Sequence, residues 1–436
     1  FNHFWKDGLR LKEITEQLCD GVQLILLTEP KFKTSHIKVI MSMPAQPEKY
    51  AGWNLAHSIL LNSCEKYPSI AKMSEKMQEL YGANLDSNIT ILGDVFQLHF
   101  TVSAIADVYA LHQETLRRES AELLLECILH PLRNPEQTGF SERAFQMELQ
   151  NLLDAIDGEI NNKRSYASKK LREIAFSGEV AAYPYYGTKE SALALTPESV
   201  YQAYKEILKQ SEILIYYVGA EDAPELKDLF RNAFSPRTVT KRRYAVPSPC
   251  KPEVRTLRES MDVNQSQLLM AFKIKDTGTE QNITPEQLRM TSLLFGGAPF
   301  SLLFSNIREK MSLCYYCSSK DISLKNTLVV SSGVSPENLE KTKQAILDQL
   351  ELLRNGEFEL DLLENARRYV INALRLAGDT PSSCMTESLE RYIREDHAGI
   401  PQRIALFKQV TREDIIRTAN ALQLDSVYIL EQEDKA

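Results

Sequence analysis

One stretch of the chain carries most of the information about its fold: Phe295-Gly-Gly-Ala-Pro-Phe-Ser-Leu-Leu-Phe-Ser-Asn-Ile-Arg-Glu-Lys-Met-Ser-Leu-Cys-Tyr315. Its glycine pair is expected to break a helix, because glycine lacks a side chain and lets backbones pack closely. The apolar pattern predicts that the helix resumes over residues 300–310 and that a strand follows over residues 312–318. The order helix, break, helix and strand is therefore the local prediction.

Two side chains of this stretch, Arg308 and Tyr315, stand seven residues apart. An arginine at the end of a helix and a tyrosine on the next strand can converge on one point, where they offer a planar fork of donors and a hydroxyl. Together they could hold a peptide carbonyl, or the oxyanion that forms when water attacks it. Residue types alone favour a simpler interpretation, in which Arg308 pairs with a carboxylate and Tyr315 packs in the sheet.

Outside this stretch, the order of predicted elements indicates a long internal repeat, with one unit in each half of the chain. In the first half the apolar periodicity predicts strands and helices in this order: strands 22–27 and 37–43, helix 52–61, strands 84–91 and 95–102, helices at about 104–128, 141–156 and 168–176, and strand 213–218. The second half repeats much of that order: strand 266–274, helix 284–294, strands 312–318 and 328–333, helices 335–354, 360–376 and 386–394, and strand 427–430. Each half also closes on a helix with a capped start, at Leu195-Thr-Pro-Glu-Ser199 and Val410-Thr-Arg-Glu413, followed by a strand.

The predicted fold class is α+β, with two homologous domains that each contain a mostly antiparallel sheet backed by helices. The predicted boundaries are residues 1–225 for the first domain, 226–255 for a linker and 256–436 for the second domain. The linker is placed there because Val246-Pro-Ser-Pro-Cys-Lys-Pro252 is rich in proline, which is typical of a semi-rigid spacer.

The bulk composition is that of an ordinary globular protein of 436 residues, with 43% hydrophobic and 25% charged residues. A net charge of −8 gives no reason to expect binding to nucleic acid, and no apolar run is long enough to predict a membrane span. The seven cysteines are scattered, which suits reduced thiols in a cytoplasm better than a disulfide framework. The pair in Cys314-Tyr-Tyr-Cys317 is not expected to serve in redox chemistry or metal binding, since it falls in a predicted strand and no second pair accompanies it.

The quoted stretch is similar to the second domain of the insulinase/pitrilysin/mitochondrial processing peptidase family. Members of that family carry a glycine-containing turn, a helix ending in Arg-Glu-Lys, and a Leu-x-Tyr strand. Their substrate-binding arginine and tyrosine fall here on Arg308 and Tyr315. The resemblance implies that each pair of domains forms one half of a clamshell around a chamber.

The same family is defined by His-x-x-Glu-His on a first-domain helix and a later glutamate, which hold zinc and activate water. No such motif exists among the seven histidines of this chain. The helix that resembles the motif is Asn54-Leu-Ala-His-Ser-Ile-Leu-Leu-Asn-Ser-Cys64. In that register Asn54 and Ser58 take the two histidine-ligand positions, His57 takes the water-activating position, and Ala155 takes the third ligand position. We therefore expect no catalytic residue and no metal in this chain, and a structural role for His57.

The resemblance implies a bacterial non-catalytic partner subunit. In that interpretation Arg308 and Tyr315 orient a peptide, an edge strand of the first domain pairs with it, and a zinc-bearing paralogue cleaves it, as part of peptide maturation. The alternatives are a zinc-free peptide-binding or chaperone-like homodimer and a helper in translation-factor modification. A stand-alone hydrolase with an unusual site has the least support.

Overall fold

The computed structural model describes residues 11–237, 239, 241–244, 246–275, 283–396 and 398–433. The described residues divide into two compact units. The first unit takes its residues from 1–157, 184–244 and 376–396, and the second takes its residues from 158–183, 245–375 and 397–436. Each unit contains one mixed sheet backed by helices, which confirms the predicted fold class.

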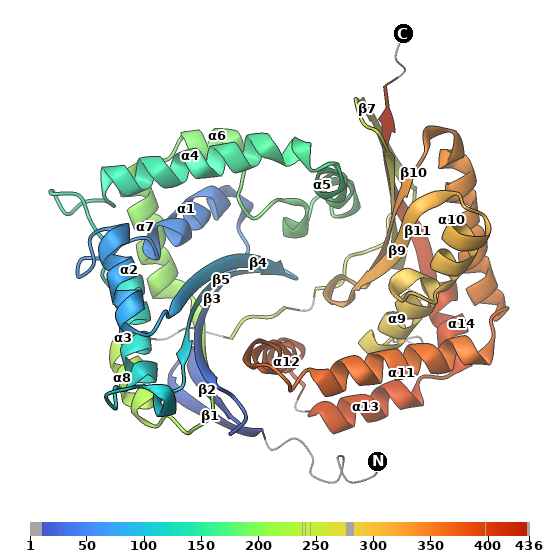
Figure 1. The fold of residues 1–436 in the computed structure, drawn as a ribbon. Helices are drawn as coiled ribbons and strands as arrows, with labels where there is room; N and C mark the ends of the chain where they lie inside the picture. The colour runs from blue at the N-terminus through green and yellow to red at the C-terminus, as the bar shows by residue number, and fades with distance from the viewer. Residues whose placement is uncertain are drawn as a thin grey trace. The chain divides into compact units, whose positions relative to one another are not determined.

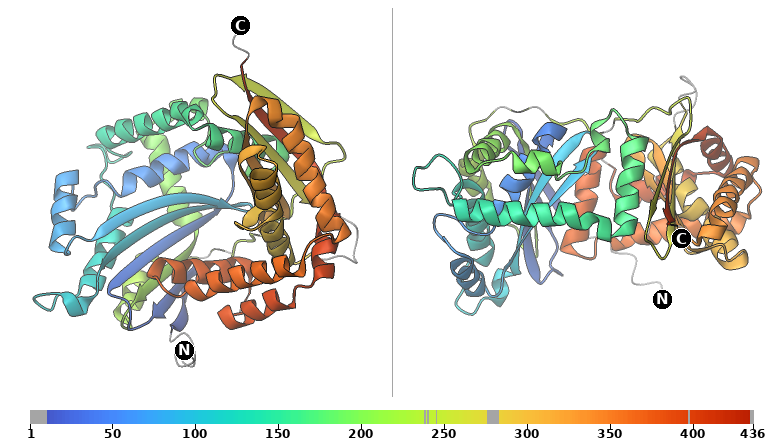
Figure 2. Two further views of the ribbon diagram at one scale, coloured as in Figure 1. Left: turned by 45° about the vertical axis from the view of Figure 1, so that its right-hand side comes forward. Right: turned by 90° about the horizontal axis from the view of Figure 1, so that it is seen from above.

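The first unit is built on a six-stranded sheet with the order β1-β2-β6-β3-β5-β4. Its strands twist and curve, as Figure 2 shows. The central strand β6 has the sequence Glu-Ile-Leu-Ile-Tyr-Tyr-Val-Gly and is buried along its whole length, as expected for a strand covered on both faces. The strands span β1 (Lys12–Cys19), β2 (Val22–Thr28), β3 (Thr34–Pro44), β4 (Asn84–Leu92), β5 (Val95–Ile105) and β6 (Glu212–Gly219).

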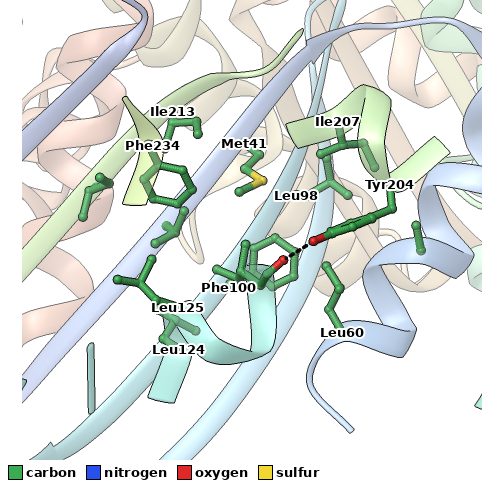
Figure 3. Close-up of a cluster of buried hydrophobic side chains, with 14 of the residues drawn as sticks. Met41, Leu60, Leu98, Phe100, Leu124, Leu125, Tyr204, Ile207, Ile213 and Phe234 are labelled. Carbon is green, nitrogen blue, oxygen red and sulfur yellow. Dashed lines mark hydrogen bonds between the residues drawn. The ribbon is translucent and has the colours of Figure 1, made fainter. Parts of the chain in front are cut away.

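Most helices of the first unit cover one face of this sheet. Between them and the sheet lies a continuous apolar core, part of which is drawn in Figure 3. In this core the hydroxyl of Tyr204 donates to the carbonyl oxygen of Ile128 at 2.9 Å, so its one polar atom is satisfied. The helices span α1 (Tyr50–Leu60), α2 (Ile70–Glu79), α3 (Leu116–Leu129), α4 (Glu142–Gly158), α6 (Lys189–Leu193), α7 (Pro197–Gln210), α8 (Glu225–Phe234) and α12 (Pro381–Arg394).

The second unit contains a five-stranded sheet with the order β7-β11-β8-β10-β9. Strand β7 is parallel to β11, and the pairs β11–β8, β8–β10 and β10–β9 are antiparallel. In the first sheet, β2 is likewise parallel to β6, and the pairs β6–β3, β3–β5 and β5–β4 are antiparallel. The second sheet therefore repeats the strand directions of the first sheet without β1. The strands span β7 (Arg255–Met261), β8 (Ser266–Ile274), β9 (Cys314–Ile322), β10 (Thr327–Val334) and β11 (Leu422–Gln432).

Two helices of the second unit begin at capping residues that the sequence predicts. Thr284 and Thr411 both accept a backbone N–H three residues later and close a capping box. The helices span α5 (Lys163–Ala175), α9 (Pro285–Ser292), α10 (Leu339–Asn355), α11 (Leu360–Leu376), α13 (Ile400–Gln409) and α14 (Arg412–Ala421), with wide π-helical turns η5 (Leu293–Gly297) and η6 (Leu303–Lys310).

The two units do not follow the predicted boundaries at residues 225 and 256, because two helices belong to the sheet of the other half. Helix α5 packs through Ala167, Leu171 and Phe176 on the second sheet. Helix α12 packs through Cys384 and Met385 on the first sheet. Helices α5 and α12 each cover the face of their sheet that lies opposite the other helices of the unit. Figure 1 shows this for the second sheet, with α5 on one face and α10 on the other.

Several local predictions were wrong, among them the starts of α5 and α12, which lie at Lys163 and Pro381 and not at residues 168 and 386. The helix placed at about 104–128 begins only at Leu116, because the strand alternation continues through β5 to Ile105 and pairs with β3 from Thr34. The predicted linker contains helix α8, whose apolar side chains Leu226, Phe230 and Phe234 are buried in the first core. The strand at 312–318 is displaced to β9, 314–322. None of the described helices is both long enough and apolar enough to cross a membrane.

Candidate functional site

The positions that resemble the zinc motif lie on α1, which is buried at every residue except Ser58. His57 is only 3% exposed, its ring packs on Phe100 at 4.7 Å, and its Nε2 donates to the backbone oxygen of His99 at 3.1 Å. Burial lowers the pKa of His57 from 6.5 to about 4, although the bond to His99 favours the charged form. His57 is therefore a neutral donor within the core of the first unit.

The other three positions are equally unsuited to a metal. Asn54 is buried, and the hydroxyl of Ser58 donates back to the Asn54 carbonyl at 3.1 Å. Ala155 lies exposed on α4 and has no ligand atom. Within the described ranges, no three His, Cys, Asp or Glu side chains come together as a metal site would require. The residues present do not fit zinc.

His99 is a buried partner that the sequence analysis did not single out. It lies on β5 with 3% exposure, and its Nε2 is 2.9 Å from the hydroxyl of Thr90 on β4. Burial lowers its pKa to about 3, and the nearby charge of Lys38 acts in the same direction. The period-two alternation of β5 could have placed His99 on a covered face, but its contact with α1 depends on the packing of helix on sheet.

Arg308 occupies the last turn of η6 and is exposed. Its guanidinium lies over the ring of Phe304, 4.8 Å from the ring centroid. Among the residues that the structure describes, no carboxylate forms an ion pair with it. Its planar fork of N–H donors is therefore available to a ligand.

Tyr315 follows at the start of β9 and is 66% exposed. Residues 314 and 316 of β9 pair with consecutive residues of β10, so Tyr315 is an extra residue in a bulge. Its hydroxyl has no hydrogen-bond partner in the described part of the chain. The simpler interpretation, an ion-paired arginine and a packed tyrosine, does not hold for these described contacts, and peptide binding by the pair stays a prediction.

The same bulge affects Cys314 and Cys317. Three residues apart on a regular strand they would face opposite ways, but the extra residue brings the two thiols into hydrogen-bond contact. The Cys317 thiol lowers the pKa of Cys314 to about 7, and Arg308 contributes in the same direction. The cysteine pair that the sequence analysis set aside is thus a pair of interacting free thiols.

A further feature was missed altogether. A cavity of about 370 Å³ lies in the second unit beside α5, over strands β9 and β10. The signal was present in the sequence, because Arg164, Ser168 and Arg172 have the four-residue spacing of one helix face. The lining consists of Arg164, Ser168, Leu171, Arg172, Ala175, Phe176, Leu269, Ser318, Ser319, Lys320, Ile322, Val329 and Ser331.

Comparison with known proteins agrees with this geometry. A family model described as the peptidase M16 inactive domain matches residues 194–370. The chain is 24% identical over 414 residues to a probable inactive metalloprotease, YmfF, of Bacillus subtilis (strain 168), a match that covers 94% of this chain and 96% of that protein.

The solved structure of a conserved protein from Enterococcus faecalis V583 matches with a TM-score of 0.89 and 26% identity, over 97% of this chain and 99% of that one. A peptidase M16 inactive domain from Pseudomonas fluorescens shares the fold, with a TM-score of 0.77 and 15% identity over 98% and 99% of the two chains. Residues 194–370 of this chain are therefore similar to the peptidase M16 inactive domain, and the chain as a whole is similar to a probable inactive metalloprotease.

Proposed function

We propose that this chain is the non-catalytic subunit of a two-chain zinc metallopeptidase. In this proposal Arg308 and Tyr315 hold and orient a peptide, and a zinc-bearing paralogue cleaves it. The observation that supports it most is a contrast between two sets of side chains. The zinc-motif positions, such as His57, are bonded within their own fold or lack a ligand atom, whereas Arg308 and Tyr315 are exposed and have no polar partner among the described residues.

The chemistry of the pair suits a peptide carbonyl. A guanidinium can donate two parallel N–H groups, and a phenol can donate one O–H. Both donors strengthen their hydrogen bonds as negative charge develops on the carbonyl oxygen, so they would favour the tetrahedral intermediate over the substrate. They supply no nucleophile and no general base, which is why the proposal needs a second chain.

The edge strand β4 offers a second contact for an extended peptide. Among the described strands it pairs with β5 alone, so its other edge offers N–H and C=O groups for pairing, and its side chains are at most partly buried. A peptide could add to this edge as a further strand, with affinity from backbone hydrogen bonds. The expected setting is peptide maturation in the cytoplasm.

The test is co-expression of this chain with a His-x-x-Glu-His paralogue from the same genome. We expect peptidase activity only when both chains are present. In the complex, Arg308→Ala is expected to lower kcat/KM about 100-fold, the usual loss for one donor to a developing oxyanion, and Tyr315→Phe is expected to lower it less. Arg368→Ala is the matched control, because Arg368 is also exposed in the second unit and has no ion-pair partner among the described residues.

Two results would contradict the proposal. One is full activity of the zinc-bearing paralogue alone. The other is a complex that assembles and cleaves normally with both Arg308 and Tyr315 replaced. Size-exclusion chromatography of each variant complex separates loss of assembly from loss of peptide handling.

A further inference from the structure

The cavity beside α5 arises from a mismatch in width between a helix and a sheet. Helix α5 contacts β7, β8 and β11, three of the five strands of the second sheet. A helix is about 10 Å across and neighbouring strands are about 4.8 Å apart, so one helix covers little more than two strands. The same face of β9 and β10 is left beside the helix, and the cavity lies over it.

The floor of the cavity is apolar. It is formed by Leu171 of α5, by Phe176 directly after that helix, and by Leu269, Ile322 and Val329 from the sheet. Serine hydroxyls lie among these side chains, and the hydroxyls of Ser318 and Ser331 lie 3.4 Å apart across β9 and β10. A volume of about 370 Å³ lies within the usual range for ligand sites. The floor can therefore accept apolar side chains together with a few polar groups.

The charge of the lining is entirely positive. Arg164, Arg172 and Lys320 contribute to it, and no aspartate or glutamate does. The chain as a whole has more acidic than basic residues, 59 against 51, so an acid-free lining is not a consequence of composition.

These three cations are also free of ion pairs among the described residues. Their helix neighbours differ, because Lys169 pairs with Glu159 and Lys170 pairs with Glu173. Arg164 stacks with its guanidinium 4.4 Å from the ring centroid of Tyr316, which orients the cation and leaves its in-plane N–H groups free to donate.

We propose that this cavity binds the carboxyl-terminal end of a peptide whose last residues are apolar. The free carboxylate would be bound by Arg164, Arg172 and Lys320, the side chains would lie on the apolar floor, and the peptide groups would bond to the serine hydroxyls. Charge complementarity selects an anion, and the apolar floor excludes a bare inorganic one. The proposal rests on the cavity alone and is independent of the peptide-orienting role of Arg308 and Tyr315.

The test is fluorescence anisotropy of the full chain with a short peptide that ends in Leu-Val and carries a neutral dye at its amino end. We expect the peptide acid to bind at least tenfold more tightly than the same peptide with a terminal amide, and we expect its affinity to fall as salt is added. Arg164→Gln and Arg172→Gln should each weaken the acid and leave the amide unchanged. Arg368→Gln, an exposed arginine elsewhere in the second unit, is the control.

A second variant tests the volume rather than the charge. Ser168 is exposed on α5 and lines the cavity, so Ser168→Trp should fill the space without disturbing a buried side chain and should abolish binding. Equal binding of acid and amide, or no binding of either, would overturn the proposal. Octanoate provides the remaining arm: if it displaces the peptide at equal or lower concentration, the occupant is a free carboxylic acid and the assignment to a peptide end is wrong.

Discussion

The buried histidines of the first unit should make its stability depend strongly on pH. His57 lies in the core between α1 and the first sheet, and His99 is buried on β5 of the same sheet. Burial lowers the pKa of His57 to about 4 and that of His99 to about 3. In the unfolded chain both titrate near 6.5. Between the folded and unfolded pKa values the unfolded chain binds more protons, so protonation favours unfolding and stability falls as the pH falls below about 6.5.

The size of the effect follows from these values. Each histidine changes the free energy of unfolding by RT ln of a ratio, in which (1 + 10^(pKa−pH)) of the unfolded chain is divided by the same expression for the folded chain. Between pH 8 and pH 5 this lowers the free energy of unfolding by about 2 kcal/mol for each residue. His57 and His99 together should therefore cost about 4 kcal/mol over that range. This is a large part of the roughly 5–15 kcal/mol that a folded protein usually has.

The assay is urea unfolding at a series of pH values, followed by the fluorescence of Trp53. Trp53 is fully buried in the same core as His57 and so reports on this unit. Trp5→Phe removes the only other tryptophan of the chain. His57→Gln keeps a side-chain N–H donor for the His99 carbonyl but removes one titrating group, so the slope of stability against pH between 5 and 6 should fall by about 1 kcal/mol per pH unit, the contribution of one such histidine. His112→Gln is the control, because His112 is exposed.

The reasoning would be refuted by a His57→Gln variant whose slope equals that of the parent chain. It would also be refuted by a direct titration, with ¹³C- or ¹⁵N-labelled histidine in NMR, that gives His57 a midpoint above 6 in the folded protein. A change in the unfolding midpoint at pH 8 alone would not decide the matter, because it reports the lost packing of the ring on Phe100 and not the proton.

Two further predictions concern the second unit. Asp425 and Lys273 are both fully buried and lie 3.7 Å apart, and burial lowers the pKa of Lys273. Asp425→Asn should therefore lower the free energy of unfolding in urea by about 3 kcal/mol, and the double variant with Lys273→Met should lose less than the two single losses added together. A loss below about 1 kcal/mol for Asp425→Asn would contradict this account. The rate at which Cys314 reacts with iodoacetamide should rise with pH with a midpoint near pH 7, because Cys317 lowers the pKa of Cys314. Mass spectrometry after brief labelling should find Cys314 modified before the buried Cys64. A midpoint above pH 8 would show that the contact with Cys317 does not lower the pKa of Cys314.

Much of the fold could be predicted because its signals are local. The apolar run of β6, the alternation of β4 and the capping boxes that open α7 and α14 depend on a few neighbouring residues, and these elements lie close to where the sequence places them. The repeated order of elements also predicted two similar sheets, and the two sheets do share one order of parallel and antiparallel strand pairs.

The rest could not be predicted, because it depends on which surfaces meet. An amphipathic helix reveals that it covers something but does not reveal which sheet, so the exchange of α5 and α12 between the halves is invisible to a pattern of residues. The exposure of Tyr315 has the same origin. Strand alternation predicts which face a side chain takes only while pairing is regular, and the bulge at Tyr315 is set by the register of β9 on β10.

The packing of α1 also bears on whether a zinc site could be restored in this chain. A zinc site would need His at residues 54 and 58, Glu at 155 and a carboxylate at 57, but residue 57 now faces a backbone carbonyl in a closed core. A carboxylate there would oppose that carbonyl without a donor, and burying an uncompensated charge costs several kcal/mol. Restoring the ligands would therefore conflict with the packing of the unit as well as requiring several substitutions at once. Among the described residues, Arg308, Tyr315 and the cations beside α5 are exposed and open to a ligand, and they all belong to the second unit.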